Sequence, residues 1–233
     1  MRMLDLFSGI GGFSLAASWA GIKTVQFVEN DKYCQRVLAK NFKGVPIHDD
    51  IKTFKGQPGT ADIVSGGFPC QPFSVAGQRR GTEDDRALWP EMFRIIQEVQ
   101  PAWVLGENVA GIVSLELDNV LSDLEDEGYE TQAFIIPACA VGAPHRRDRV
   151  WIVANSTGIG GNWWMAGPRK EAGRWAHTQV ERRSRWPAEP AVGRVAHGVS
   201  GRVDRLKGLG NAPVPQVAYE ILRTIKYLND GEV

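Results

Sequence analysis

Short apolar runs alternate with amphipathic stretches along the first 155 residues. Thr24–Val28, Ile63–Ser65 and Trp103–Leu105 are short runs typical of strands, whereas apolar residues recur at helical spacing in Leu88–Val99 and Leu115–Glu127. Strands that alternate with helices form a parallel sheet with helices on both faces. The pattern therefore predicts an α/β fold with a doubly wound, mostly parallel sheet. The other expected strands are Arg2–Phe7, Val45–Ile47, Tyr129–Pro137 and Arg149–Val153, and a last helix is expected over Gln216–Leu228.

A glycine-rich turn follows the first expected strand. Its sequence is Ser8-Gly-Ile-Gly-Gly12, and a helix is expected directly after it. Such a turn lets a ligand approach the backbone, and the helix N-terminus behind it offers free N–H groups. Glu29 stands at the end of the second strand, where a carboxylate can accept hydrogen bonds from ribose hydroxyls. Although many glycine-rich turns only close a β–α unit, the two features together indicate an adenosine-containing ligand.

Cys70 lies in a loop after the fourth expected strand. Pro69 and Pro72 flank it, and Gly66 and Gly67 precede it, so the backbone there is predicted to be a shaped loop. Open α/β sheets hold their chemistry at the carboxyl ends of the strands, where this loop lies. The sequence thus favours a thiol presented for reaction, and the alternative is a small buried side chain, as most lone intracellular cysteines are.

Further along the chain, charged residues stand at strand ends. Glu107 follows an apolar strand directly, which is unusual for a carboxylate unless it is paired or used. Arg147 and Arg149 alternate, which places two guanidinium groups on one face of a strand, unless they form only a solvated edge. Gln78–Arg86 is polar and contains adjacent arginines, which is typical both of surface loops and of lids over bound nucleic acid.

Length and composition limit the class of protein. With 233 residues, 43% of them hydrophobic, the chain can form one α/β domain and a small appendage. Its N-terminus lacks the apolar run of a signal peptide, and no run approaches the roughly 18 apolar residues of a membrane-spanning helix. The three cysteines lie far apart without a histidine at ligand spacing, which supports neither a disulfide framework nor a metal site. We expect a cytoplasmic monomer that binds no metal and no membrane.

Charge is segregated along the chain although the net charge is zero. Ser156–Lys207 contains ten Lys and Arg against four Asp and Glu, together with four of the eight tryptophans. Basic residues interleaved with aromatic residues are typical of nucleic-acid surfaces, but a tryptophan-rich segment can also be packed structure. This segment also lacks aliphatic periodicity, so we expect it to be irregular.

Five motifs resemble, in order, those of the cytosine-5 DNA methyltransferases. They are Asp5-Leu-Phe-Ser-Gly-Ile-Gly-Gly12, Gly67-Phe-Pro-Cys-Gln-Pro-Phe-Ser74, Glu107-Asn-Val109, Arg147-Asp-Arg149 and Gly210-Asn-Ala-Pro-Val-Pro215. The resemblance covers residues 5–153 and 208–228. It implies a fold that binds S-adenosylmethionine, and methyl transfer to carbon 5 of a flipped cytosine in double-stranded DNA.

The resemblance also implies roles for particular side chains. Cys70 would be the nucleophile that adds to carbon 6 of the base, Glu107 the acid at ring N3, and Arg147 and Arg149 the base-holding arginines. With the glycine-rich turn included, the residues expected to bind the cofactor are Phe7, Ser8, Gly9, Gly11, Gly12, Glu29, Asn30, Asp50, Ile51, Pro69, Leu88, Asn211 and Ala212. Those expected at the DNA are Gln71, Ser74, Arg79, Arg80, Arg182, Arg183 and Arg185.

The expected organisation has three parts. Residues 1–155 would form the catalytic domain, residues 156–207 a small target-recognition region, and residues 208–233 a helix that returns to the catalytic domain. Family members usually have a longer variable region, so this chain resembles a compact, phage-associated branch. Two alternatives are a tRNA cytosine-5 methyltransferase on the same fold and a DNA-binding relative without activity. The first tends to show Pro-Pro-Cys and Cys-Phe-Thr, whereas this chain has Phe68-Pro-Cys and no Cys-Phe-Thr.

Overall fold

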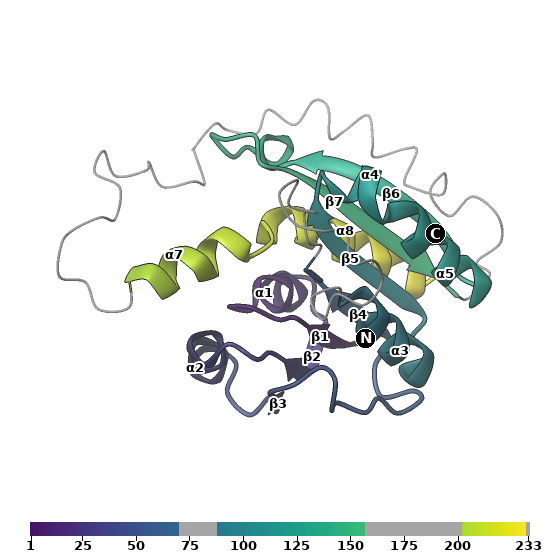
Figure 1. The fold of residues 1–233 in the computed structure, drawn as a ribbon, viewed down its shortest axis with the longest axis horizontal. Helices are drawn as coiled ribbons and strands as arrows, with labels where there is room; N and C mark the ends of the chain where they lie inside the picture. The colour runs from purple at the N-terminus through teal and green to yellow at the C-terminus, as the bar shows by residue number, and fades with distance from the viewer. Residues whose placement is uncertain (70–87, 157–201, 232–233) are drawn as a thin grey trace, which may run out of the picture.

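A seven-stranded, mostly parallel sheet forms the centre of the protein (Figure 1). The computed structural model describes residues 1–69, 88–156 and 202–231, and the account below concerns these residues. The strand order is β3-β2-β1-β4-β5-β7-β6; the first five strands in this order are parallel, and β7 is antiparallel to both of its neighbours. The strands are β1 (Arg2–Leu6), β2 (Lys23–Val28), β3 (Ile47–His48), β4 (Ile63–Gly66), β5 (Trp103–Val109), β6 (Glu130–Pro137) and β7 (Asp148–Asn155). The doubly wound α/β prediction is confirmed.

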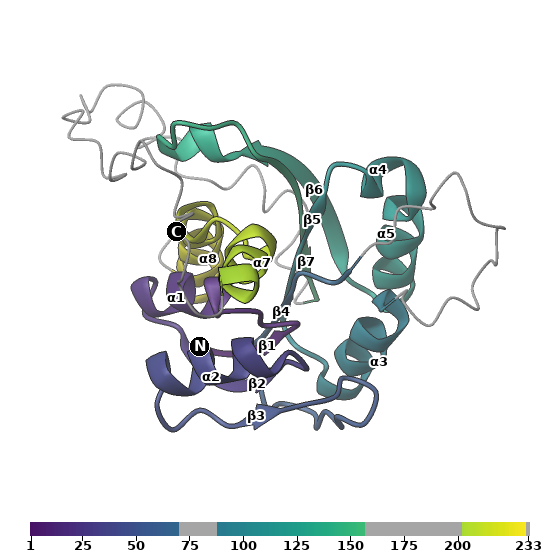
Figure 2. The same ribbon diagram turned by 60° about the vertical axis from the view of Figure 1, so that its left-hand side comes forward.

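Helices cover both faces of the sheet, as Figure 2 shows. One face packs against α3 and α5, and the other against α1 and α8. None of the helices in the described part of the chain is long and apolar enough to cross a membrane. The helices are α1 (Gly12–Trp19), α2 (Lys32–Asn41), α3 (Trp89–Val99), α4 (Ile112–Leu115), α5 (Leu117–Asp126), the 3-10 helix η1 (Ala138–Val141), α7 (Arg202–Asn211) and α8 (Pro215–Asn229).

The central strands are apolar on both faces because both faces are buried. On β5, Val104 packs with the α3 and α5 layer, whereas its neighbours Trp103 and Leu105 pack with α1 and α8. Successive side chains of a strand point to opposite faces, so one short apolar run fills two cores. This explains why the strands read as continuous apolar runs in the sequence.

Two differences from the sequence prediction concern the elements around the site. The strand expected to end at Leu105 extends to Val109, because Glu107 and Val109 pair with Trp151 and Arg149 of β7. Glu107 therefore lies within a strand and not after it. Helix α7 was not expected at all, since its sequence contains two glycines and has little apolar periodicity. It runs across position 207, where the sequence analysis places a boundary between two parts of the chain.

A buried polar cluster joins β1, β2 and β4 to α1. Oδ2 of Asp5 on β1 accepts a hydrogen bond from Ser14 of α1 (2.6 Å), and its Oδ1 accepts one from Ser65 of β4 (3.2 Å). Thr24 of β2 donates to Ser14 (3.0 Å). Burial raises the pKa of Asp5 to about 7, although both serine hydroxyls lower it. The cluster ties three strands to α1, and the sequence analysis did not single out its carboxyl group.

Gly12 is the point where α1 meets the segment before α8. A Cβ at this position would lie 2.9 Å from both Cγ and Cδ of Pro213, which is closer than side-chain carbons normally approach. The preceding Gly11 has a positive φ of 88°, and a Cβ there would lie 2.5 Å from the ring of Phe42. Both glycines therefore serve close packing behind the turn.

We expect Gly12→Ala to destabilise the fold. In an open helix the change from Gly to Ala adds about 1 kcal/mol of stability, but here the methyl group must displace Pro213, and overpacking of this kind costs about 1–3 kcal/mol. The free energy of unfolding in urea measures the effect. Gly111→Ala is the matched control because nothing lies within 4 Å of its added Cβ. Equal stability of Gly12→Ala and wild type would contradict this account of the packing.

Candidate active site

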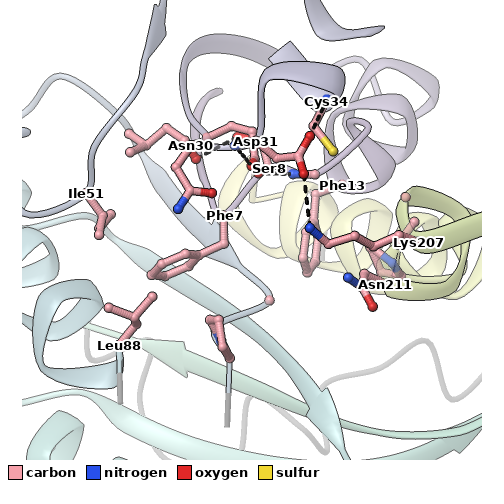
Figure 3. A pocket seen from close by; sticks show the side chains of 18 of the residues that line it. Phe7, Ser8, Phe13, Asn30, Asp31, Cys34, Ile51, Leu88, Lys207 and Asn211 are labelled. Atoms are coloured by element: carbon pink, nitrogen blue, oxygen red, sulfur yellow. Dashed lines mark hydrogen bonds and ion pairs between the residues drawn. The ribbon is translucent and has the colours of Figure 1, made fainter. Parts of the chain in front are cut away.

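A cavity of 290 Å³ opens at the carboxyl ends of β1, β2 and β4. This volume is near the lower end of the range for small-molecule sites, about 300–1,000 Å³. Figure 3 shows Phe7, Ile51 and Leu88 facing one another on one side, and Asp31, Lys207 and Asn211 on the other. The cavity thus has an apolar end and a polar end.

Most residues expected at the cofactor line this one cavity. They are Phe7, Ser8, Gly9, Glu29, Asn30, Asp50, Ile51, Pro69, Leu88, Asn211 and Ala212. Gly11 and Gly12 are not among the lining residues, and they pack against Phe42 and Pro213 as described above. The lining residues come from both ends of the chain, so the fold brings together positions about 200 residues apart in sequence.

The turn after β1 has a backbone shape that Glu29 holds in place. Phe7 has a positive φ of 51°, which is rare for an aromatic residue, and Gly9 has a φ of 54°. The two carboxylate oxygens of Glu29 accept hydrogen bonds from the backbone N–H groups of Gly9 and Asp31, each at 2.7 Å. A carboxylate has about four acceptor sites, so Glu29 can accept two more hydrogen bonds from a ligand.

Helix α7 forms one wall of the cavity and is tied to α2 by an ion pair. Nζ of Lys207 lies 3.1 Å from Oδ2 of Asp31, and Oδ1 of Asp31 accepts hydrogen bonds from the N–H groups of Tyr33 and Cys34 at the start of α2. The hydrogen bond from the Cys34 N–H has the largest effect in lowering the pKa of Asp31, and the hydrogen bond from Lys207 lowers it further. Neither Asp31 nor Lys207 was predicted as a site residue. The signal for Asp31 is its position as the N-cap of α2.

Arg94 of α3 fixes the apolar end of the cavity. Its guanidinium donates to the carbonyl oxygens of Ile51 (2.8 Å) and Phe54 (3.1 Å) and forms ion pairs with Glu91 and Glu98. Backbone carbonyls held in this way keep the Ile51 side chain in place against the cavity. Arg94 was also not predicted, because an arginine on an amphipathic helix looks like a solvated residue in the sequence.

A buried acid lies beside the cavity, on β5. Nε of Arg149 on β7 is 2.9 Å from Oε1 of Glu107, and the two side chains are 18% and 8% exposed. Burial raises the pKa of Glu107 to about 7, against the opposing effect of Arg149 and Arg147. Among the described residues no donor is aligned for a hydrogen bond to this Oε1. The carboxyl can therefore hold a proton near neutral pH.

The loop that leads to residue 70 passes directly over this acid. A Cβ at Gly67 would lie 3.4 Å from Oε2 of Glu107. Buried Asn108, next to the acid, donates from Nδ2 to the carbonyl oxygen of Phe68 (2.9 Å) and so fixes the loop. Asn108 was not predicted as a site residue, although it lies inside the Glu107-Asn-Val109 motif.

The two arginines that the sequence places on one face have different partners. Arg149 contacts the acid, whereas Nη2 of Arg147 donates to the carbonyl oxygens of Gly210 (2.7 Å) and Ala212 (2.9 Å). Arg147 has a positive φ of 40°. This structure therefore turns Arg147 toward the end of α7.

Several predicted residues lie outside the described part of the chain. They are Cys70, Gln71, Ser74, Arg79, Arg80, Arg182, Arg183 and Arg185. Their expected roles as nucleophile and DNA contacts stay predictions.

We expect Glu107→Gln to lose less free energy of unfolding than wild type does as the pH rises from 5 to 8. Because the pKa of Glu107 is about 7 in the native state and 4.5 as the ordinary value, the native state binds its proton more tightly. The proton bound at Glu107 stabilises the native state fully below pH 4.5. This contribution, up to roughly 3 kcal/mol, is lost as the pH rises through about 7. Urea unfolding from pH 5 to pH 8 measures this. Asp126→Asn, at an exposed position, is the control; a variant with the same pH slope as wild type would contradict the assignment.

Comparisons with known proteins agree with this geometry. The family model "C-5 cytosine-specific DNA methylase" matches residues 1–185. Type II methyltransferase M2.BsuMI of Bacillus subtilis is 38% identical over 167 residues, which are 66% of this chain and 42% of that protein. Type II methyltransferase M.HhaI of Haemophilus parahaemolyticus is 35% identical over 158 residues, which are 66% of this chain and 48% of that protein. The chain thus spans less than half the length of these relatives.

Solved structures show the same fold. A DNMT2 mutant of Spodoptera frugiperda has a TM-score of 0.58 and 25% identity, and the match covers 68% of this chain and 50% of that one. The Dnmt2 methyltransferase of S. pombe has a TM-score of 0.63 over 78% of this chain and 57% of that one, and at 22% identity this likeness concerns the fold alone. The match to the family model covers most of the sequence, so this chain belongs to the C-5 cytosine-specific DNA methylase family.

Proposed function

We propose that the protein is a DNA (cytosine-5-)-methyltransferase that transfers a methyl group from S-adenosylmethionine to a flipped cytosine in duplex DNA. One observation carries the proposal: a cavity of 290 Å³ that is lined by the Glu29 carboxylate opens next to a buried, protonatable Glu107, under the loop that leads to residue 70. A methyl donor, an acid and a thiol are the three components that this reaction needs.

The residues of the cavity fit S-adenosylmethionine. Phe7 faces Ile51 and Leu88, which gives an apolar slot for the adenine ring. Glu29 keeps acceptor sites for the two ribose hydroxyls, and Asp50 at the rim can accept from the adenine amino group. The polar end of the cavity, with Asp31, Lys207 and Asn211, suits the charged amino-acid end of the donor. When bound, S-adenosylmethionine supplies a methyl group on a sulfonium centre.

The protein's own residues prepare the base. Carbon 5 of cytosine is a poor nucleophile while the ring is aromatic, and addition of the Cys70 thiolate to carbon 6 makes it enamine-like. Glu107 holds a proton at ring N3, which neutralises the charge that the addition creates. Arg149 keeps the Glu107 carboxyl in place through the ion pair. Because the acid is buried and its pKa is about 7, it can hold this proton at neutral pH.

Duplex DNA as substrate is supported by the names of the relatives. The matched proteins are Type II methyltransferases, which suggests a modification enzyme of a restriction-modification system. Arg79, Arg80, Arg182, Arg183 and Arg185 would contact phosphates, and Gln71 and Ser74 would contact the flipped base. A tRNA cytosine-5 methyltransferase on the same fold stays the second candidate, and an assay with both acceptors decides between them.

We expect Cys70→Ser to abolish methyl transfer and to leave donor binding intact, because a serine hydroxyl is a far weaker nucleophile at neutral pH. Transfer of a radioactive methyl group to a mixed-sequence DNA, with tRNA in a parallel reaction, measures activity. A duplex with 5-fluorocytosine at the methylated position should trap wild type as a covalent adduct. Cys139→Ser, at an exposed cysteine, is the control and should keep activity.

Three results would count against this proposal. Methyl transfer to tRNA and not to DNA would favour the alternative of a tRNA cytosine-5 methyltransferase. Transfer to neither acceptor, with donor binding retained, would indicate a DNA-binding relative without activity. An active enzyme that forms no adduct on its methylated site would exclude the covalent mechanism.

We expect Glu29→Ala to weaken donor binding at least about tenfold, since charge-assisted hydrogen bonds to the ribose contribute about 1.5–3 kcal/mol. Calorimetry with S-adenosylmethionine measures the affinity. Glu29→Gln keeps the shape and one acceptor oxygen, so its loss should be smaller. An affinity of Glu29→Ala within twofold of wild type would mean that Glu29 only shapes the turn through Gly9 and Asp31.

A further inference from the structure

The C-terminal end of α7 is held by a side chain from a distant part of the sequence. The last carbonyl groups of a helix have no partner within the helix, and they carry partial negative charge. The last turn of α7 contains no basic residue of its own. Arg147 supplies the cation instead, by donating to the carbonyl oxygens of Gly210 (2.7 Å) and Ala212 (2.9 Å).

This end of α7 is also a wall of the cavity. Asn211 and Ala212 line the cavity. The carbonyl groups that Arg147 holds belong to Gly210 and Ala212, on either side of Asn211. Gly208 and Gly210 make α7 intrinsically weak, because each glycine in a helix costs about 1 kcal/mol relative to alanine. The position of the wall must therefore come from contacts with the rest of the protein. Those described above are the Lys207–Asp31 ion pair and the two hydrogen bonds of Arg147.

Arg147 also belongs to the acid site. It stands two residues before Arg149, at the entry to β7, and its charge acts on Glu107. Both hydrogen bonds to α7 use Nη2. A guanidinium has five N–H donors, so Nε and Nη1 can contact a base or a phosphate while Nη2 stays on α7. One side chain can thus serve both halves of the site.

We propose that Arg147 is a positioning residue for the methyl donor: it fixes the Gly210–Ala212 end of α7, and through this it links the donor cavity to the Glu107–Arg149 site. The inference rests on the proposed function in taking S-adenosylmethionine as the ligand of the cavity. It goes beyond the role in holding the base that the resemblance implies, because it requires Arg147 to support donor binding when DNA is absent.

Calorimetry with S-adenosylmethionine on the full chain, without DNA, tests the proposal. Arg147→Met keeps an unbranched stem of similar length and removes the charged guanidinium with its donors, and we expect it to weaken donor affinity about tenfold. Arg147→Lys keeps the charge and should restore part of the affinity. Arg146→Met is the matched control: this neighbouring side chain is 82% exposed and pairs with Asp148, so its donor affinity should stay within twofold of wild type.

A second measurement separates positioning from general stability. Amide hydrogen exchange in Arg147→Met should be faster in residues 202–212 and unchanged in the sheet. Donor affinity within twofold of wild type in Arg147→Met would overturn the inference while leaving the proposed function intact. If Arg147→Met does not fold, Arg147→Gln replaces it, and unchanged donor affinity together with unchanged exchange in α7 would overturn the inference equally. Failure of wild type itself to bind S-adenosylmethionine would overturn the proposed function and the inference with it.

Discussion

Parallel pairing at the centre of the sheet is the constraint on which the site depends. β1 pairs in parallel with β2 and β4, and β4 pairs in parallel with β5, so four strands end at one edge. The glycine-rich turn, Glu29 and the loop toward residue 70 follow three of these strands, and Glu107 lies near the end of the fourth, β5. Because neighbouring strands lie about 4.8 Å apart, these groups are close to one another at the edge of the sheet. A slip in register of one residue would turn Glu107 to the opposite face of the sheet.

Burial then gives the carboxyl groups of this edge different properties. Asp5 and Glu107 are buried with few compensating charges, and burial raises the pKa of each to about 7. Asp31 accepts hydrogen bonds from helix N–H groups and pairs with Lys207, so its pKa is lowered and it stays ionised. Glu107 on β5 can thus hold a proton, whereas Asp31 at the start of α2 stays an anion beside the cavity. Glu107 and Asp31 are both ordinary carboxyl groups, so the difference between their pKa values comes from their surroundings.

Local signals in the sequence predicted the fold class, the glycine-rich turn and Glu29, because these signals coincide with the sheet edge, whereas the family resemblance supplied most of the other residues that line the cavity. Glu29 and the turn after β1 follow apolar runs directly, so their common location follows from strand order alone. Arg94 and Asn108 escaped prediction because each donates to backbone carbonyls of a segment that is distant in sequence, and Asp31 because its partner Lys207 lies 176 residues further along the chain. Helix α7 escaped because its glycines oppose helix formation, and long-range contacts with Asp31 and Arg147 decide its structure. Asp31 and Arg147 lie far from α7 in sequence, so no pattern within the helix itself predicts these contacts.

The cavity is consequently a composite of two ends of the chain. Phe7, Glu29 and Ile51 come from the first strands, whereas Lys207, Asn211 and Ala212 come from α7 and the turn after it. Helix α8 packs behind them against α1, where Gly12 admits Pro213 at close range. An N-terminal fragment that contains all the strands would still lack one wall of the cavity and the part that α8 contributes to the cover of one face of the sheet. Completion of the cavity and completion of the fold are therefore coupled, because the same return of the chain provides both.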